Sequence, residues 1–244
     1  MLKILLVGAC GKMGKVVREC AKEQNIKIIA GVDRCEQKIE DFAIYPNFSQ
    51  ITQNFDVVLD FSHPALTNAL ASFCFECKKP LVVATTGHNA EQLSTLKNLS
   101  KFVPVFQSNN FSFGVNVFSK LVLLAQKLLP NVDIEMLETH HGAKADSPSG
   151  TALTLANLMQ NENQNLTFEV GRGKNQSKQK NHITIHSIRG GTQNGKHQVL
   201  FFDQGETITI SHEAHSKNIF ALGAFKACEF VKNQKNGFYT MSDL

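Results

Sequence analysis

The sequence contains no tryptophan and only two tyrosines among its 244 residues. Proteins that bind single-stranded nucleic acid stack the bases on aromatic side chains, so this scarcity argues against that class. The formal net charge is only +4, and the lysines and arginines are scattered apart from a short basic run at 174–180. We therefore expect no nucleic-acid partner.

Long apolar runs are also missing. The apolar segments KILLVGAC (3–10) and KPLVVATTG (79–87) are well short of the roughly 20 residues that cross a bilayer. The N-terminus runs straight into a strand pattern and does not read as a signal peptide. Six cysteines without the spacing of a disulfide framework fit a reducing compartment. The sequence thus predicts a cytoplasmic protein with no membrane partner.

One cysteine pair, Cys74 and Cys77, forms the motif C-F-E-C. This motif can be a redox dithiol or half of a zinc site. The surrounding segment 64–79 has the apolar periodicity of an amphipathic helix, with both cysteines on its apolar stripe. No second Cys-x-x-Cys completes a metal site. We therefore interpret the pair as part of a buried helix face and expect no metal.

The first 108 residues alternate short apolar strands with helices. Continuous apolar strands that alternate with helices are typical of a parallel sheet covered on both faces. The sequence therefore predicts an α/β fold with an N-terminal Rossmann-like, parallel-sheet domain. The expected strands are 3–8, 26–33, 55–62, 80–87 and 102–108, and the expected helices are 12–24, 64–79 and 90–101.

The pattern changes after about Asn110. A long apolar helix at 113–130 leads to an alternating strand at 132–141 and a second helix at 149–160. Four period-2 runs follow, at 166–171, 182–190, 196–204 and 206–214. Asn194-Gly195 and 203–205 are signals for hairpin turns between these runs. We therefore expect a C-terminal α+β domain with a mostly antiparallel sheet.

Three glycines, Gly8, Gly11 and Gly14, lie between the first expected strand and the first helix. Glycine allows the backbone to turn tightly and to approach a pyrophosphate, which the free N–H groups of the helix N-terminus can bind. The second strand ends at Asp33, about where a carboxylate meets the adenosine ribose of a dinucleotide. Arg34 follows and suits a 2′-phosphate. An acid beside a base suggests that NADH and NADPH are both accepted.

A polar segment at 138–153, ETHHGAKADSPSGTAL, carries the strongest indication of chemistry. His140 and His141 end a strand, so they face opposite sides, and one of them is expected to face a cleft and donate a proton. Lys144 supplies positive charge nearby. Ser149 is a suitable N-cap, which gives the following helix an anion-binding N-terminus. The alternative is a polar loop in which Ser149 only caps, the histidines end a strand and Lys144 is solvated.

Five segments together resemble the 4-hydroxy-tetrahydrodipicolinate reductase family of bacterial lysine and diaminopimelate biosynthesis: VGACGKMG, VVATTGH, SNNFSFGVN, ETHHGAKADSPSGTA and HEAHSKNIFALGAF. The resemblance implies NADPH- or NADH-dependent reduction of 4-hydroxy-tetrahydrodipicolinate, a small dicarboxylate, to tetrahydrodipicolinate with loss of water. It also implies a homotetramer. The implied domains are a dinucleotide-binding domain at 1–111, to which 217–244 return, and a substrate-binding and oligomerisation domain at 112–216.

The resemblance also assigns roles to individual residues. The chain departs from the family pattern at Ala84, where glycine is usual and a Cβ is added beside the expected nicotinamide, and at Lys217, where arginine is usual. The implied catalytic residues are His140, as the proton donor, and Lys144; the substrate carboxylates are assigned to His141, Gly150 and Thr151; and the cofactor is assigned to Gly8, Ala9, Cys10, Gly11, Lys12, Met13, Asp33, Arg34, Ala84, Thr85, Thr86, Ser108, Asn109, Asn110 and Phe111.

Two other functions compete with this one. Another two-domain NAD(P)-dependent amino-acid dehydrogenase would use the same first domain, but the paired histidines with Lys144 argue against it. A non-catalytic dinucleotide sensor would have no need of a proton donor such as His140.

Overall fold

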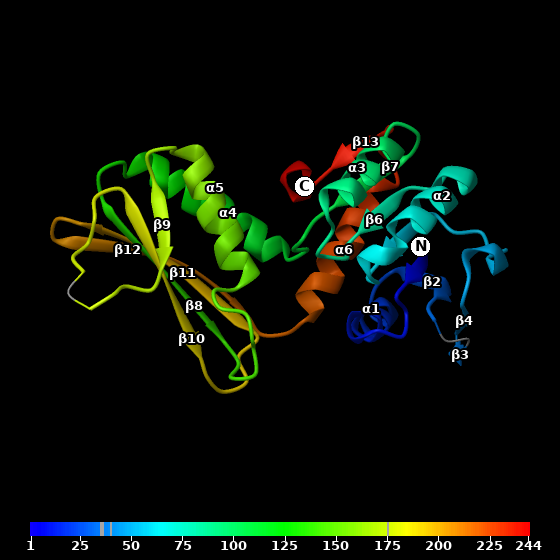
Figure 1. The fold of residues 1–244 in the computed structure, drawn as a ribbon. Helices are drawn as coiled ribbons and strands as arrows, with labels where there is room; N and C mark the ends of the chain where they lie inside the picture. The colour runs from blue at the N-terminus through cyan, green and yellow to red at the C-terminus, as the bar shows by residue number, and fades with distance from the viewer. Residues whose placement is uncertain (35–36, 40, 175) are drawn as a thin grey trace. The chain divides into compact units, whose positions relative to one another are not determined.

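The computed structural model describes residues 1–34, 37–39, 41–174 and 176–244. The chain divides into two compact units (Figure 1). Unit 1 comprises Met1–Phe113 and Asn218–Leu244, and unit 2 comprises Gly114–Lys217. Among the described residues, no helix has the length and apolar character that a membrane crossing requires.

Unit 1 is built on one large sheet. Among the strands of the described residues, seven run parallel, and β3 alone is antiparallel, to its neighbour β4. The parallel sheet predicted from the apolar strands is therefore confirmed, with short strands added at both edges. In spatial order the strands are β13 (Gly237–Tyr239), β7 (Pro104–Gln107), β6 (Leu81–Val83), β5 (Val57–Asp60), β1 (Leu2–Val7), β2 (Ile26–Val32), β4 (Phe42–Tyr45) and β3 (Gln37–Ile39).

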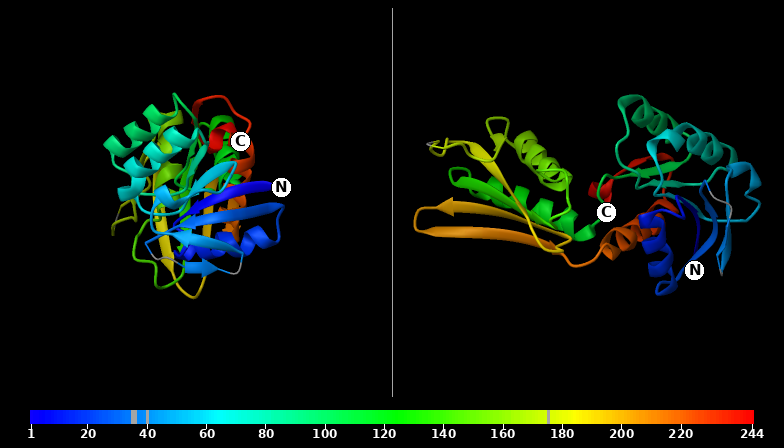
Figure 2. Two further views of the ribbon diagram at one scale, coloured as in Figure 1. Left: turned by 90° about the vertical axis from the view of Figure 1, so that its right-hand side faces the viewer. Right: turned by 60° about the horizontal axis from the view of Figure 1, so that its bottom comes forward.

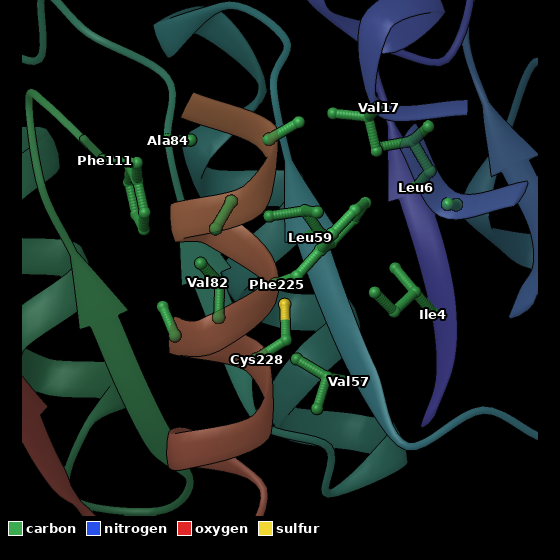
Figure 3. Packing of buried hydrophobic residues seen from close by; sticks show 14 of the residues in the cluster. Ile4, Leu6, Val17, Val57, Leu59, Val82, Ala84, Phe111, Phe225 and Cys228 are labelled. Atoms are coloured by element: carbon green, nitrogen blue, oxygen red, sulfur yellow. The ribbon is translucent and has the colours of Figure 1, made fainter. Parts of the chain in front are cut away.

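Helices cover both faces of this sheet, so its central strands are buried on both sides. In β1, Ile4 and Leu6 join a cluster with α1 and α6, while Leu5 and Val7 join a second cluster with α2 and α3. Figure 3 shows the first cluster, with α6 lying across the strands. The helices are α1 (Lys12–Lys22), α2 (Thr67–Cys77), α3 (Ala90–Leu99) and α6 (Asn218–Val231), with short 3₁₀ turns at Phe48–Gln50, Pro64–Leu66 and Met241–Asp243.

The cysteine pair lies on α2, as its periodicity predicted. Cys74 is fully buried in the second cluster, and Cys77 is half-buried beside it. Burial raises the pKa of the Cys74 thiol, so this side chain behaves as a small apolar group.

The last long helix, α6, belongs to unit 1 although it follows unit 2 in the sequence. Its Gly223 lies directly against the backbone of Phe111: a Cβ at position 223 would come within 1.6 Å of the Phe111 carbonyl oxygen. Only glycine permits this approach. The helix thereby supports the segment that follows β7.

Unit 2 is a five-stranded sheet with two helices, α4 (Phe113–Leu128) and α5 (Gly150–Glu162), on one face. β8 alternates regularly between buried and half-buried residues, and β11 does so over most of its length. Ile134 and Met136 of β8 contact the helices, and Glu138 and His140 continue the same buried face. In spatial order the strands are β12 (Glu206–Ala214), β11 (Gly195–Asp203), β8 (Asp133–His140), β10 (His182–Arg189) and β9 (Thr167–Val170).

The sheet of unit 2 is mixed, which corrects the expectation of a mostly antiparallel sheet. β8 pairs in parallel with β10, and β10 in parallel with β9, while β11 is antiparallel to both β8 and β12. β9 runs in the same direction as β8 because α5 carries the chain back across the sheet before β9 begins. The long β11–β12 hairpin is visible in Figure 2.

The two hairpin signals had different outcomes. Residues 203–205 form the predicted turn, since β11 and β12 pair from Asp203 opposite Glu206 onward. Asn194-Gly195 does not join a hairpin, because β8 lies between β10 and β11. The local turn chemistry was overridden by the pairing of both strands with β8.

Candidate active site

The glycine-rich turn of unit 1 has the geometry of a phosphate cradle. Gly8 follows β1 with a φ of +80°, and a Cβ there would lie 2.3 Å from the carbonyl oxygen of Phe61. A Cβ at Gly14 would lie 2.2 Å from the carbonyl oxygen of Gly8. Gly11 is the N-cap of α1 and provides no side-chain cap. The first-turn N–H groups of α1 have no partner within the helix and suit an anion.

Asp33 connects the end of β2 to this turn. One carboxylate oxygen accepts a hydrogen bond from the N–H of Cys10 at 2.7 Å, and the other accepts from the N–H of Arg34 at 2.7 Å. Each oxygen retains a second lone pair that can accept a ribose hydroxyl. The Arg34 side chain is exposed. These residues fit a dinucleotide.

The remaining candidate cofactor residues follow β6 and β7 at the same carboxyl edge of the sheet. Ala84 and Thr85 are buried, Thr86 is exposed, and Phe111 is buried beside α6. The Ala84 methyl group belongs to the first hydrophobic cluster (Figure 3), so the Cβ that departs from the family pattern contributes to the core of unit 1. Ligands of open α/β sheets bind at this edge.

The end of β5 contributes residues that the sequence patterns did not single out. Asp60 is almost fully buried, and its carboxylate accepts hydrogen bonds from the hydroxyl of Ser62 and, at 3.0 Å, from the Ser62 N–H. The same N–H donates to the Thr85 hydroxyl at 2.8 Å. Burial raises the pKa of Asp60. A pocket of about 570 Å³ opens beside this turn and includes Ser62, His63 and Thr86.

In unit 2, His140 ends β8 and is only 7% exposed. Its Nδ1 lies 2.5 Å from Oε2 of Glu138, whose side chain is completely buried. Arg189 of β10 clamps the same carboxylate, with Nη1 2.9 Å from Oε2 and Nη2 2.6 Å from Oε1. The N–H of Ser149 completes the set at 3.1 Å from Oε1. One buried carboxylate therefore joins the histidine, a neighbouring strand and the start of α5.

The charges in this cluster determine its protonation. Burial would raise the pKa of Glu138, but hydrogen bonds from Arg189 and His140 outweigh it and lower the pKa to about 2. Burial lowers the pKa of His140, Glu138 opposes that effect, and Lys144 and Arg189 add to it. Glu138 is thus ionised at neutral pH and accepts the Nδ1 proton of His140, which leaves Nε2 for other partners.

The start of α5 is linked to a second buried histidine. Ser149 is the N-cap predicted from the sequence, and its hydroxyl accepts from the N–H of Ala152 at 3.2 Å. The same hydroxyl lies 2.9 Å from Nε2 of His197. Burial lowers the pKa of His197 to about 4, so this ring is neutral at pH 7. It meets the His140 ring edge-on, with 5.2 Å between ring centroids.

The other residues of the polar segment surround this cluster. The ammonium of Lys144 lies 2.8 Å from Asp146, whose side chain is mostly exposed. Half-buried His141 donates its N–H to the carbonyl of Gln193 at 2.9 Å. Gly150 and Thr151 are the first two residues of α5. Unit 2 thus brings the candidate proton donor, a cation and a helix N-terminus together.

The sequence patterns did not indicate three residues of this cluster: Glu138, Arg189 and His197. Glu138 could have been found, because it stands two residues before His140 and therefore on the same face of the strand. Arg189 lies directly opposite His140 in the β8–β10 register, which depends on a pairing that no local pattern reveals. Gly195 completes the environment, since a Cβ there would lie 2.9 Å from Nε2 of His140.

Comparisons with known proteins agree across both units. A family model described as dihydrodipicolinate reductase, N-terminus, matches residues 2–111, and its C-terminal counterpart matches residues 114–244. A 4-hydroxy-tetrahydrodipicolinate reductase from Clostridium tetani is 44% identical over 244 residues, which cover 99% of this chain and 96% of that protein. One from Caldanaerobacter subterraneus is 43% identical, with 100% and 98% covered.

Solved structures show the same fold. A dipicolinate-bound dihydrodipicolinate reductase from Paenisporosarcina sp. TG-14 matches with a TM-score of 0.85 at 22% identity, covering both chains completely. A DAP dehydrogenase from C. glutamicum in complex with DAP gives a TM-score of 0.60 at 12% identity, with 98% of this chain and 92% of that one covered. At these identities the likeness concerns the fold.

Proposed function

The chain belongs to the 4-hydroxy-tetrahydrodipicolinate reductase family, and on that premise we propose that it reduces 4-hydroxy-tetrahydrodipicolinate to tetrahydrodipicolinate with NAD(P)H and loss of water, in lysine and diaminopimelate biosynthesis. The observation that carries this reading is His140, a buried histidine held by an ionised carboxylate beside Lys144 and a helix N-terminus. A non-catalytic dinucleotide sensor would have no use for such a group.

Unit 1 binds the dinucleotide, which supplies a hydride when bound. The turn from Gly8 to Met13 holds the pyrophosphate through backbone N–H groups, and Asp33 and Arg34 bind the adenosine end. The segments 84–86 and 108–111 line the nicotinamide, at the carboxyl edge where such ligands bind. The carboxylate of Asp33 accepts a ribose hydroxyl in NADH, and the exposed Arg34 meets the additional phosphate of NADPH. Both cofactors are therefore accepted.

Unit 2 binds the substrate, a small dicarboxylate. One carboxylate meets the N-terminus of α5 at Gly150 and Thr151, and His141 contributes a further polar contact. The ammonium of Lys144 exchanges its present partner, the exposed Asp146, for the substrate. Such an exchange is inexpensive for Asp146, because its mostly exposed carboxylate is solvated by water when the ammonium leaves it.

His140 delivers the proton of the reaction from Nε2, since Nδ1 is held by Glu138. Loss of water from the hydroxylated ring leaves a conjugated ring, which gains the hydride at one carbon and the His140 proton at the neighbouring carbon. The net change is one hydride and one proton gained and one water lost. His140 then regains its proton from solvent. Lys144 stabilises the negative charge that develops on the ring between these steps.

We also propose that the protein is cytoplasmic and forms a homotetramer. Light scattering after gel filtration measures the mass directly, and four copies of the 27.0 kDa chain are expected.

The function is tested by coupling the protein to the preceding synthase, with pyruvate and aspartate semialdehyde supplied, and following NADH or NADPH absorbance. Consumption that depends on the synthase is expected with both cofactors, and their two dissociation constants give the preference between them. If neither cofactor is consumed, the reductase assignment is wrong. Oxidation of diaminopimelate with NADP⁺ would instead favour the amino-acid dehydrogenase alternative.

A further inference from the structure

The proposed function uses His140 but leaves the buried charges around it unexplained. Glu138 is fully buried and ionised, and removing a carboxylate from water is unfavourable unless the carboxylate is well paired. A strand whose preceding inward residues are Ile134 and Met136 would gain stability from another apolar side chain at this position. The cluster of Glu138 and Arg189 therefore calls for a functional explanation.

We propose that Glu138, clamped by Arg189, is a positioning residue that fixes the His140 ring with Nε2 as the proton-delivering atom and ties this ring to the substrate-binding end of α5. The inference rests on the proposed function for what the proton is used for. The geometry of the pair stands independently of it.

Glu138 determines which nitrogen of the neutral His140 ring carries the proton. A carboxylate with a low pKa only accepts hydrogen bonds, so the His140 Nδ1 at 2.5 Å from it must carry a proton. The neutral ring is then bare at Nε2, and the proton that comes and goes is the one on Nε2. Hydrogen-bond partners fix metal-binding and catalytic histidines in the same way.

Arg189 holds the Glu138 carboxylate in place. Its two terminal nitrogens match the two oxygens of Glu138, which is the bidentate arrangement that guanidinium groups favour. It keeps the buried carboxylate ionised. Nη2 also donates to the carbonyl of Asp146 at 2.7 Å, in the loop that carries Lys144. Arg189 therefore connects the strand that bears His140 to that loop.

Glu138 also connects His140 to the start of α5. Glu138 accepts from the N–H of Ser149, the N-cap residue that immediately precedes Gly150 and Thr151. The same carboxylate oxygen accepts a hydrogen bond from Nη2 of Arg189. Displacement of Glu138 therefore moves the proton donor and the start of α5 together, which explains why one buried group is maintained between them.

The pair also has an electrostatic effect on His140. The charged or titratable groups that face this ring are Glu138 on its own strand, Arg189 on β10, His197 on β11 and Lys144 in the loop. Glu138 alone favours the protonated ring. Without the charge of Glu138, nothing opposes the positive charges of Arg189 and Lys144. The pKa of His140 then falls, and fewer rings carry the Nε2 proton at neutral pH.

The test compares Glu138→Gln with a matched control, Glu135→Gln. Glu135 stands three residues earlier in β8 and therefore on the other face, where it pairs with Arg172, Lys178 and His186 and does not contact His140. We expect kcat/KM of Glu138→Gln at neutral pH to fall by about 10²-fold. We also expect the descending limb of its pH profile to move by about one unit or more to lower pH. In the control, Glu135→Gln, the descending limb of the pH profile should stay at the wild-type pH.

A second measurement does not depend on catalysis. ¹⁵N NMR of histidine-labelled wild-type protein at a pH where His140 is neutral reports which ring nitrogen carries the proton. We expect Nδ1 to be protonated in the wild type and in Glu135→Gln, and Nε2 to gain population in Glu138→Gln. If Glu138→Gln does not fold, the double variant Glu138→Gln with Arg189→Met removes both charges and takes its place.

Two results would overturn the positioning role: a wild-type neutral ring protonated on Nε2, or a loss of kcat in Glu138→Gln without any movement of the pH limb. Failure of the proposed function is distinguishable, because it appears as a wild-type protein that consumes no NAD(P)H while the NMR result still decides the tautomer.

Discussion

Replacing Gly195 with alanine is expected to disable the proton donor while leaving cofactor binding intact. Gly195 begins β11, and a Cβ there would come within 2.9 Å of Nε2 and 3.3 Å of Cδ2 of His140. Carbon contacts are favourable at about 3.5–4.0 Å, so the ring must move by roughly 0.5–1 Å. Glu138 holds Nδ1 at the other end of the ring, which makes this movement a displacement of Nε2.

The magnitude follows from that displacement and from backbone strain, because Gly195 has a φ of +156°. A misplacement of about 1 Å costs on the order of 10² in rate, and an additional methyl group in a well-packed site costs about 1–3 kcal/mol of stability. We expect kcat to fall about 10- to 100-fold, the thermal midpoint to fall by several degrees, and the dissociation constant for NADH to stay within about twofold. Steady-state kinetics, thermal denaturation and NADH fluorescence titration measure these three quantities.

Gly191→Ala is the matched control. Gly191 has a φ of +56° and open space around the position of a Cβ, so alanine there adds only backbone strain of about 1–3 kcal/mol. This variant should lose stability and keep its kcat. If Gly195→Ala also keeps kcat within about twofold, the proximity of this glycine to Nε2 has no catalytic meaning and the reasoning fails.

Three further predictions concern α6, Glu138 and Lys144. In Gly223→Ala the new Cβ would lie 1.6 Å from the Phe111 carbonyl oxygen, so α6 must move away from it. This variant should have a lower thermal midpoint and bind NADH more weakly. An unchanged NADH titration would refute the supporting role assigned to α6. Glu138 has a pKa of about 2 against a usual value of 4.5, so its ionised form contributes about 3 kcal/mol to the free energy of unfolding at neutral pH, and this contribution is lost as the pH falls from 4.5 towards 2. In Glu138→Gln, stability should therefore depend less on pH in that window. An acid denaturation curve parallel to that of the wild type would contradict this. Lys144→Ala should lower kcat and raise KM together, and an effect on cofactor binding alone would contradict its assignment to the substrate.

The sequence predicted those features that depend on local pattern. The apolar strands around Leu6 and Val58 could only belong to a buried parallel sheet, and Ser149 acts as the N-cap that its position before a helix indicated. The glycine turn at Gly8 has the backbone geometry that the motif requires. Each of these follows from residues close to one another in the chain.

The missed features depend on pairing between distant segments. Arg189 reaches Glu138 only because β10 lies beside β8, and the Asn194-Gly195 signal was misread because β8 separates β10 from β11. The division of labour between His140 and His141 became interpretable only with Glu138 in view. A carboxylate that selects one ring nitrogen marks His140 as the proton donor. The spacing of two residues places Glu138 and His140 on one face of the strand, but only the structure shows the hydrogen bond between them.

The most direct test of the account is a comparison of His140→Gln with His141→Gln in the coupled assay. We predict that His140→Gln lowers kcat by about 10² or more with little change in NADH affinity, because it removes the proton donor. His141→Gln should act mainly on KM. If His140→Gln retains the wild-type kcat, the proton comes from another group and the central role given to His140 is wrong.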